Sequence, residues 1–159
     1  MATITSLLLD PTGNSQRGRN AYMVENTLDI VATTVDPSSG DVVQAITVPA
    51  NTKILAAGVQ VVESATMNTG TDATITLGTA DADEYVTSFD IDGASDGDYA
   101  PSATVAADVV LDSADTLDVT FAGTGASFTA GKLRVYAIMV DVSEQGDTTA
   151  DEVDRDQLA

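Results

Sequence analysis

The side chains that most often carry out nucleophilic and acid–base catalysis are missing from this sequence. Its 159 residues include no histidine and no cysteine. Ser-His and Cys-His arrangements both need an imidazole, and histidine is also a common general base and zinc ligand. No glycine-rich phosphate loop is present, because Gly123-Thr124-Gly125 is a bare turn. We therefore expect neither enzyme activity nor a resident organic cofactor.

Carboxylates are the reactive groups that remain, and there are 25 of them. Paired carboxylates cleave peptide bonds in aspartic proteases and glycosidic bonds in glycosidases. The turn Asn68-Thr69-Gly70 lacks the aspartate with which an aspartic-protease turn begins. Three phenylalanines, four tyrosines and no tryptophan offer few platforms on which a sugar could stack. The carboxylates therefore do not predict a hydrolase.

One acidic cluster has the composition of a cation site. Residues 90–98 alternate aspartate with glycine, and Ca²⁺ takes six to eight oxygen ligands. The EF-hand pattern is not met, because no glutamate stands at its twelfth position. The sequence leaves two interpretations, a solvated acidic loop or a calcium site whose ligands would be Asp90, Asp92, Asp96 and Asp98.

The chain is strongly acidic, with a formal net charge of −19. Residues 1–60 contribute only −2 of this charge, and residues 61–159 contribute −17. Nucleic acids and anionic membranes attract cations, so we expect the chain to bind neither of them. The longest strongly apolar stretch, Val135 to Val140, is far shorter than the roughly 18–20 residues of a membrane-spanning helix.

Hydrophobic residues between residues 22 and 142 follow the period of two that is typical of half-buried β-strands. Ala73, Ile75 and Leu77 alternate with threonines. In the same way we expect two further apolar faces, one formed by Leu117, Val119 and Phe121 and the other by Leu55, Ala57, Val59 and Val61. Further strands are predicted at about 23–35, 42–48, 84–91, 103–111 and 131–142.

The segments between these strands have the composition of turns. Residues 36–41, 49–51 and 67–72 are rich in proline, glycine, asparagine and aspartate, which favour tight reversals of the chain. About eight strands, rich in valine and threonine and joined by such turns, predict an all-β fold. We expect an antiparallel β-sandwich of the jelly-roll type.

The last predicted strand is apolar on both of its faces. Leu133, Val135, Ala137 and Met139 form one face, and the other carries Tyr136, Ile138 and Val140. Such a strand is either central and buried between two layers, or completed on one face by a neighbouring subunit. The second interpretation makes Tyr136, Ile138 and Val140 candidate contacts with another copy or another protein.

The two ends of the chain differ from its centre. Residues 1–21 lack alternation and predict an extended arm, whose Arg17 and Arg19 supply a third of the positive charge in the chain. Residues 143–159 are acidic and contain few apolar groups, which predicts a flexible tail. The predicted organisation is thus an arm (1–21), a sandwich domain (22–142) and a tail (143–159). We expect Arg17 and Arg19 to contact an acidic neighbouring subunit.

Two stretches resemble a known class of proteins. Residues 46–59 carry a Val-Pro-Ala-Asn-Thr turn into a strand, and residues 74–85 end a strand with Thr-Leu-Gly before Ala-Asp. Both are similar to small virion proteins of tailed double-stranded DNA viruses, the head decoration or cement proteins. The resemblance implies a jelly-roll domain, often trimeric, that binds the major capsid protein or other virion proteins. It also implies a place on the capsid surface after synthesis in the host cytoplasm.

Other structural roles stay open beside the capsid one. A turret, fibre or tail-associated virion subunit could use the same sandwich, and a cell-surface structural protein is a further alternative. Asp outnumbers Glu by twenty to five, and the chain has only two lysines. Two interpretations of the acidity stay open: it keeps the protein soluble and its copies apart, or it is an adaptation to high salt in a halophilic host, since the Debye length falls to about 3 Å at 1 M.

Overall fold

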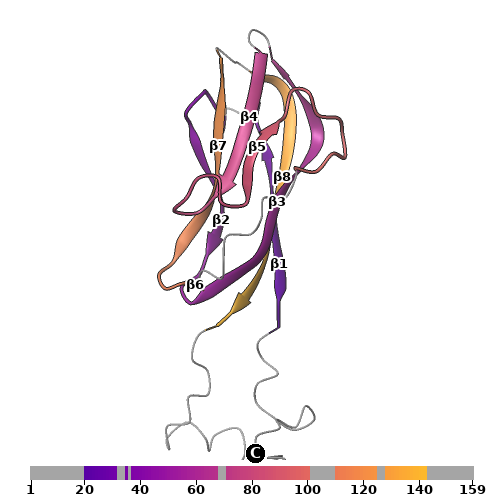
Figure 1. Cartoon of the computed structure of the whole chain (residues 1–159). Helices are drawn as coiled ribbons and strands as arrows, with labels where there is room; N and C mark the ends of the chain where they lie inside the picture. Colours follow the sequence, from indigo (N-terminus) through magenta and orange to yellow (C-terminus); the bar gives the residue numbers. More distant parts are fainter. Residues whose placement is uncertain are drawn as a thin grey trace, which may run out of the picture.

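The computed structural model describes residues 20–31, 35, 37–67, 71–100, 110–124 and 128–142. Within these residues the secondary structure consists of β-strands joined by turns and loops (Figure 1). No helix in the described part of the chain is long and apolar enough to cross a membrane. The strands are β1 (Tyr22–Asp29), β2 (Val42–Val48), β3 (Thr52–Met67), β4 (Thr71–Gly78), β5 (Val86–Asp90), β6 (Val110–Leu111), β7 (Asp115–Thr124) and β8 (Phe128–Asp141).

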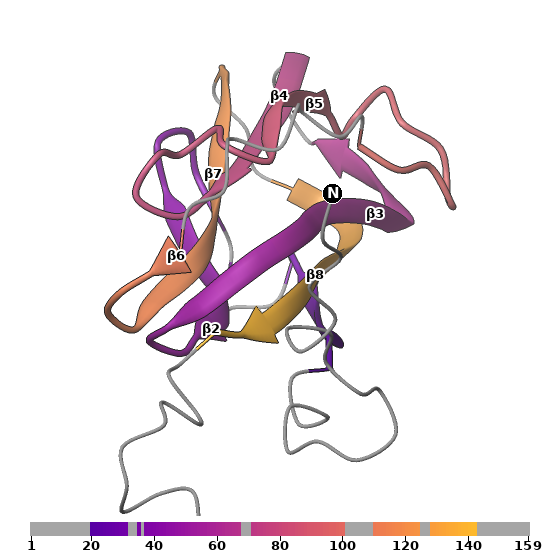
Figure 2. The same ribbon diagram turned by 60° about the horizontal axis from the view of Figure 1, so that its bottom comes forward.

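The strands form two four-stranded sheets, as predicted. The first sheet has the order β1-β8-β3-β6 and the second the order β2-β7-β4-β5. Early strands pair antiparallel with late ones in a nested series, in which β1 pairs with β8, β2 with β7, β3 with β6 and β4 with β5. β3 and β8 lie side by side in both views (Figure 1 and Figure 2). This nesting gives the all-β, jelly-roll-like sandwich that the sequence predicts.

Alternation along the strands places valine, isoleucine and leucine between the two sheets. Ile75 and Leu77 of β4 and Leu117 and Val119 of β7 are fully buried, which confirms the predicted faces of both strands. Phe121 on β7 packs edge-to-face against Phe128 on β8, with ring centroids 6.2 Å apart. Burial of these side chains removes apolar surface from water and provides most of the stabilisation of such a fold.

The predicted inner face of β3 is wrong at its beginning. Leu55 was expected in the core, but it is 41% exposed, whereas Ile54 is only 4% exposed. The register between β3 and β8 shifts between Ile54 and Ala56, which is a β-bulge. A bulge inserts one extra residue and so reverses the side to which the following residues point. After it, Ala57, Val59 and Val61 are buried as predicted.

β8 is central in its sheet, but only one of its faces is buried. The face with Leu133, Val135, Ala137 and Met139 has no exposed surface. Tyr136, Ile138 and Val140 are on the other face and are partly exposed. β8 therefore lies between β1 and β3 within its sheet, but no other sheet of the described chain covers its outer side.

Several predicted boundaries differ from the observed ones. The strand predicted at 23–35 ends at Asp29, where the carboxylate Oδ1 accepts a hydrogen bond from the N–H of Val31 at 3.1 Å and turns the chain. Of the strand predicted at 103–111, only β6 lies in the described residues. The predicted arm and tail lie outside them, except for Asn20 and Ala21, which precede β1.

Candidate interaction surface

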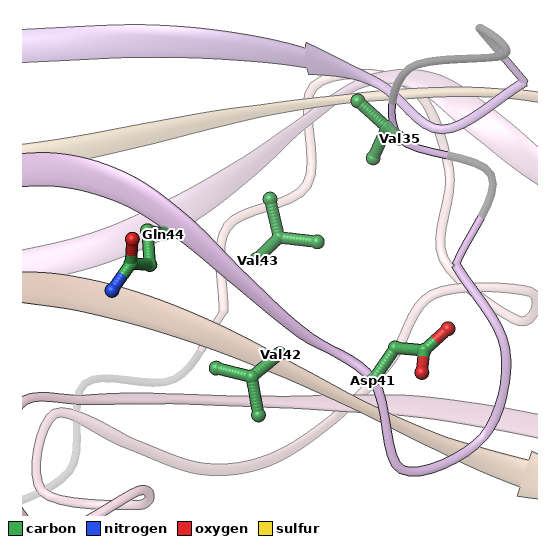
Figure 3. A pocket seen from close by; sticks show the side chains of 5 residues that line it. All are labelled: Val35, Asp41, Val42, Val43 and Gln44. Carbon is green, nitrogen blue, oxygen red and sulfur yellow. The ribbon is translucent and has the colours of Figure 1, made fainter.

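A shallow depression at the edge strand β2 has a volume of about 510 Å³ and is a candidate binding site (Figure 3). Its lining includes one carboxylate, that of Asp41, whose Oδ2 already accepts a hydrogen bond from the N–H of Ser38 at 2.7 Å. The remaining lining residues bring only apolar groups and one amide. They are Val35, Val42, Val43 and Gln44. A single carboxylate that already accepts a hydrogen bond within its own turn, beside apolar groups and one amide, does not make the paired arrangement of a catalytic site.

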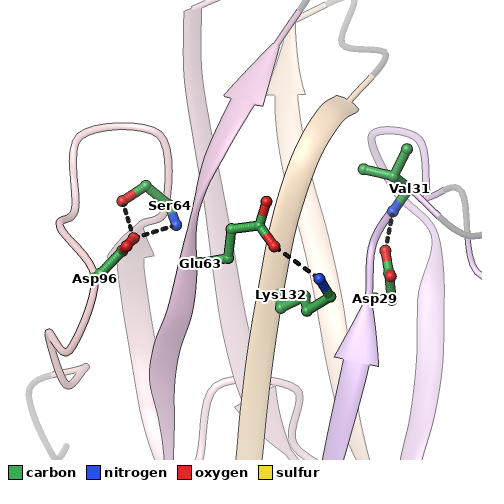
Figure 4. Close-up of polar contacts among 6 residues, drawn as sticks. All are labelled: Asp29, Val31, Glu63, Ser64, Asp96 and Lys132. Carbon is green, nitrogen blue, oxygen red and sulfur yellow. Dashed lines mark hydrogen bonds and ion pairs between the residues drawn. The ribbon is translucent and has the colours of Figure 1, made fainter.

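The acidic loop that follows β5 runs along the edge of β3. The N–H of Val61 donates to the carbonyl of Asp98 at 2.8 Å, and the N–H of Ala100 donates to the carbonyl of Val59 at 2.9 Å. One carboxylate oxygen of Asp96 accepts hydrogen bonds of 2.6 Å from both the N–H and the Oγ–H of Ser64 (Figure 4). The loop thus covers a stretch of strand edge that would otherwise be open to other chains.

The two aspartates at the start of this loop also accept backbone hydrogen bonds. Asp90 accepts one from the N–H of Gly93, and this bond is the main cause of its lowered pKa. Asp92 accepts one from the N–H of Ala73 at 2.9 Å. Partial burial, followed by a hydrogen bond with Asp90, raises the pKa of Asp92. Of the two side chains, Asp90 therefore ionises first and Asp92 keeps its proton to a higher pH.

The structure does not gather the four predicted calcium ligands around one point. The carboxylate of Asp98 accepts a hydrogen bond from the N–H of Ser95 at 2.8 Å. Within the described residues, no group of three or more acidic side chains has the geometry to hold a metal ion. Calcium binding by this loop stays a prediction, which titration calorimetry with Ca²⁺ would test.

The partly exposed side of β8 belongs to a continuous surface, which we call the outer face of the first sheet. The register brings residues of β1 and β3 into rows with those of β8. From one end to the other, the rows are Asp29–Lys132–Glu63, Thr27–Arg134–Gln60, Glu25–Tyr136–Gly58 and Met23–Ile138–Ala56, followed by the pair Val140–Lys53 with Leu55 beside it.

One end of the outer face is charged. Lys132 Nζ lies 2.8 Å from Glu63 Oε2 (Figure 4), and this carboxylate is the main cause of the raised pKa of Lys132. Arg134 lies 4.0 Å from Glu25, and its guanidinium donates a hydrogen bond to Gln60 Oε1 at 3.3 Å. The positive charges of β8 are thus balanced by acidic side chains of both neighbouring strands.

The middle of the outer face is aromatic. The ring of Tyr136 lies across Gly58, where a Cβ atom would stand only 2.6 Å from the tyrosine hydroxyl. Tyr99, which forms an isolated bridge with Gln60, meets Tyr136 edge-to-face at 6.2 Å. Tyr99 itself is 58% exposed. A glycine in β3 therefore allows the Tyr136 ring to lie across the sheet, with the Tyr99 ring against it at an interplanar angle of 71°.

The other end of the outer face is mainly apolar, with Lys53 as its charged side chain. Met23 is 58% exposed and Leu55 is 41% exposed, and both lie beside the partly buried Ile138 and Val140. The alternation of the sequence predicts Tyr136, Ile138 and Val140 for this surface, but it does not predict Met23, Leu55 and Tyr99 there. Leu55 was assigned to the core because the bulge was not recognised. Met23 and Tyr99 carry no pattern that separates them from core residues.

The predicted contacts of the arm, Arg17 and Arg19, lie outside the described residues. The structure therefore does not show where they lie relative to the outer face. The three basic residues that it does describe, Lys53, Lys132 and Arg134, are all on the outer face of the first sheet.

Comparison with known proteins identifies the fold. No protein-family model and no curated protein matches this sequence. Among solved structures, a chain of the cyanophage Pam1 capsid asymmetric unit is similar, with a TM-score of 0.59, 16% identity and coverage of 87% of this chain and 97% of that chain. A chain of the Ralstonia phage GP4 capsid matches with a TM-score of 0.55 and 14% identity, over 86% of this chain and 93% of the other.

A third similar chain comes from the acidic stable capsid structure of the Helicobacter pylori bacteriophage KHP30. Its TM-score is 0.50 at 13% identity, and the match covers 76% of this chain and 86% of that chain. In all three cases the match covers most of both chains, so the matched chains are about as long as this one. At these identities the likeness concerns the fold.

Proposed function

We propose that this chain is a structural virion protein of a tailed double-stranded DNA virus, and more specifically a capsid decoration (cement) protein. The observation that carries the proposal is the fold shared with chains of three phage capsids over most of their length. A small sandwich of the same size in each of them fits an accessory role that stabilises a shell. The two turn-and-strand motifs of the sequence point the same way.

The proposed mechanism is non-enzymatic. A rigid sandwich binds across neighbouring capsid subunits and holds them together through the surface that it buries. We propose that residues 1–21 contribute an arm, with Arg17 and Arg19 contacting acidic groups of the major capsid protein. The support for this role is electrostatic, since the first 60 residues are nearly neutral while the remainder carries −17. We also propose that the protein acts as a homo-oligomer, with a trimer favoured by the resemblance to cement proteins.

The arm is tested by deletion. Purified full-length chain and a variant lacking residues 2–20 are mixed with undecorated virus shells, and bound protein is measured after sedimentation. We expect the full-length chain to bind and the deletion variant to lose binding. A second variant, with Arg17→Ala and Arg19→Ala only, separates the charges from the rest of the arm. Equal occupancy of all three proteins on shells would refute the proposed role of the arm.

The alternative is a turret, fibre or tail-associated subunit of the virion. Its support is that a jelly-roll sandwich is a general scaffold, since fold alone does not determine function. Electron cryo-microscopy of intact particles separates the two roles. A cement protein covers the whole shell in a regular lattice, whereas a tail or turret subunit is confined to a vertex. Density for this chain at a vertex alone would replace the cement proposal with the alternative.

A further inference from the structure

The charge of the described chain is distributed very unevenly over its surface. The described residues include sixteen acidic and three basic side chains. Three acids, Glu25, Asp29 and Glu63, share the outer face of the first sheet with all three described bases. This face is therefore neutral overall. The other thirteen described acids are not part of these rows.

The outer face of the second sheet shows the contrast. Its rows are built mainly from threonine, with Asp118 and Asp90 among them. Two copies of this chain that met through such a surface would bring like charges together, and each copy carries −19 in total. Like charges that face each other across an interface cost several kcal/mol and exclude wrong contacts. The neutral outer face of the first sheet is free of this repulsion.

The same face also has the composition of a protein interface. Tyrosine, methionine and arginine are enriched at interfaces, and this surface carries Tyr99, Tyr136, Met23 and Arg134. Its apolar end adds Leu55 and the partly buried Ile138 and Val140. The Tyr136 ring lies across Gly58, close to the backbone of β3.

We propose that the outer face of the first sheet is the surface through which copies of this chain associate with one another. The inference rests on the homo-oligomer of the proposed function and adds the surface that forms it. Exposed Met23, Leu55 and Tyr99 are the anchors, while the rows around Lys132 and Arg134 fix the orientation of the copies. Because the rest of each copy is acidic, association strengthens as salt screens the repulsion between the bodies.

Sedimentation of the full chain at increasing NaCl tests the proposal. Met23→Glu places a charge at the apolar end of the outer face. Val42→Glu makes the same kind of change at an equally exposed valine (55% against 58%) of the second sheet. We expect Met23→Glu to raise the concentration needed for association by about tenfold or more, as charges at interface anchors do, and Val42→Glu to leave it within about twofold. Melting curves of both variants establish that they are folded.

A second measurement does not depend on a charged variant. The chain has no cysteine, so Leu55→Cys and Val42→Cys each introduce a single thiol. We expect the Leu55→Cys thiol to react more slowly with a maleimide as protein concentration rises, and the Val42→Cys thiol to react at a constant rate.

Three results would overturn the inference. The first is a wild-type chain that stays monomeric at about 100 μM in about 1 M NaCl. The second is a Met23→Glu variant that associates at the same concentration as wild type. The third is a maleimide reaction that slows with protein concentration at Val42→Cys and not at Leu55→Cys. None of these depends on shells. Association through this face without shell binding would contradict the cement role alone, and shell binding by a monomer would contradict this inference alone.

Discussion

At the scale of single residues, two glycines of this chain make room for very different neighbours. A Cβ atom at Gly78 would collide with the carbonyl oxygen of Asp81, which belongs to the backbone of the β4–β5 loop. At Gly58 the nearest atoms belong to the far end of the Tyr136 side chain. A backbone segment cannot move aside as a tyrosine ring can. Of these two glycines, Gly78 is therefore the one whose replacement disturbs the fold more.

We therefore predict unequal effects of the two glycine-to-alanine changes. Gly78→Ala should lower the free energy of unfolding by at least about 2 kcal/mol, because overpacking against backbone forces the loop to shift. Gly58→Ala should cost less than about 1 kcal/mol, since alanine is favoured over glycine in strands and offsets the displaced ring. Urea unfolding measures both values. Equal losses would contradict the assignment, and near-ultraviolet circular dichroism would report the displacement of Tyr136.

Asp96 gives a prediction about pH. Hydrogen bonds from Ser64, first from its hydroxyl and then from its N–H, hold the pKa of Asp96 below its ordinary value. A carboxylate whose pKa is lowered in the folded state stabilises the fold above its unfolded pKa of about 3.9, and this stabilisation is lost as pH falls through the folded pKa.

The corresponding experiment compares Asp96→Asn with wild type. The variant should melt at a lower temperature at pH 7, and the gap should close as the pH falls through the lowered pKa of Asp96, because the wild-type carboxylate then becomes protonated. Asp112→Asn, at an exposed aspartate in the turn between β6 and β7, serves as the control and should show no gap. A gap for Asp96→Asn that persists in acid would show that Ser64 is not bound by a carboxylate.

At the scale of elements, β8 and β3 show how one strand can serve two purposes. The inner face of β8 is completely buried, and its outer face contributes Tyr136, Ile138 and Val140 to a surface. The bulge at the start of β3 moves Ile54 into the core and Leu55 onto the same outer face. Both strands therefore supply core residues and surface anchors from adjacent positions.

Two leucines test this division. Leu133→Ala removes a fully buried side chain of β8 and should lower the free energy of unfolding by about 2–5 kcal/mol. Leu55→Ala makes the same chemical change at a 41% exposed position and should cost about 0.5 kcal/mol or less in the monomer. Denaturant unfolding at low protein concentration checks both. A large loss for Leu55→Ala under these conditions would place it in the core, as the simple alternation of the sequence predicts.

At the scale of the whole molecule, the acidity of the chain determines how it responds to salt. The formal net charge of −19 produces self-repulsion that screening removes. We predict that the melting temperature rises between dilute buffer and about 2 M NaCl, where the Debye length is below about 3 Å. No stabilisation over this range would contradict the proposed adaptation to high salt and the halophilic host.

A single variant controls for general salt effects. Asp81 and Asp83 lie close together on the β4–β5 loop, and a hydrogen bond with Asp81 raises the pKa of Asp83, with like-charge repulsion as the second cause. Asp83→Asn should raise the melting temperature in dilute buffer and should bring a smaller gain in 2 M salt. An equal gain at both salt concentrations would show that repulsion is not the relevant cause.

The sequence by itself determined the fold class, because burial of one side of a strand imposes a period of two on its residues. It also determined the buried faces of β4 and β7, whereas both faces of β8 are apolar in sequence and only the structure shows which one is buried. The register of β3 could not be predicted, because a bulge depends on how hydrogen bonds fit between two strands and leaves no sign in the alternation.

The tertiary structure alone shows what the chemically suggestive residues contact. Asp90, Asp92, Asp96 and Asp98 resemble a cation loop in sequence, but each accepts a hydrogen bond from a nearby backbone N–H in the fold. Only the pairing of β1, β8 and β3 brings Met23, Leu55 and Tyr136 onto one face with Lys132 and Arg134. These residues are distant along the chain, so their common surface exists only once the strands have paired.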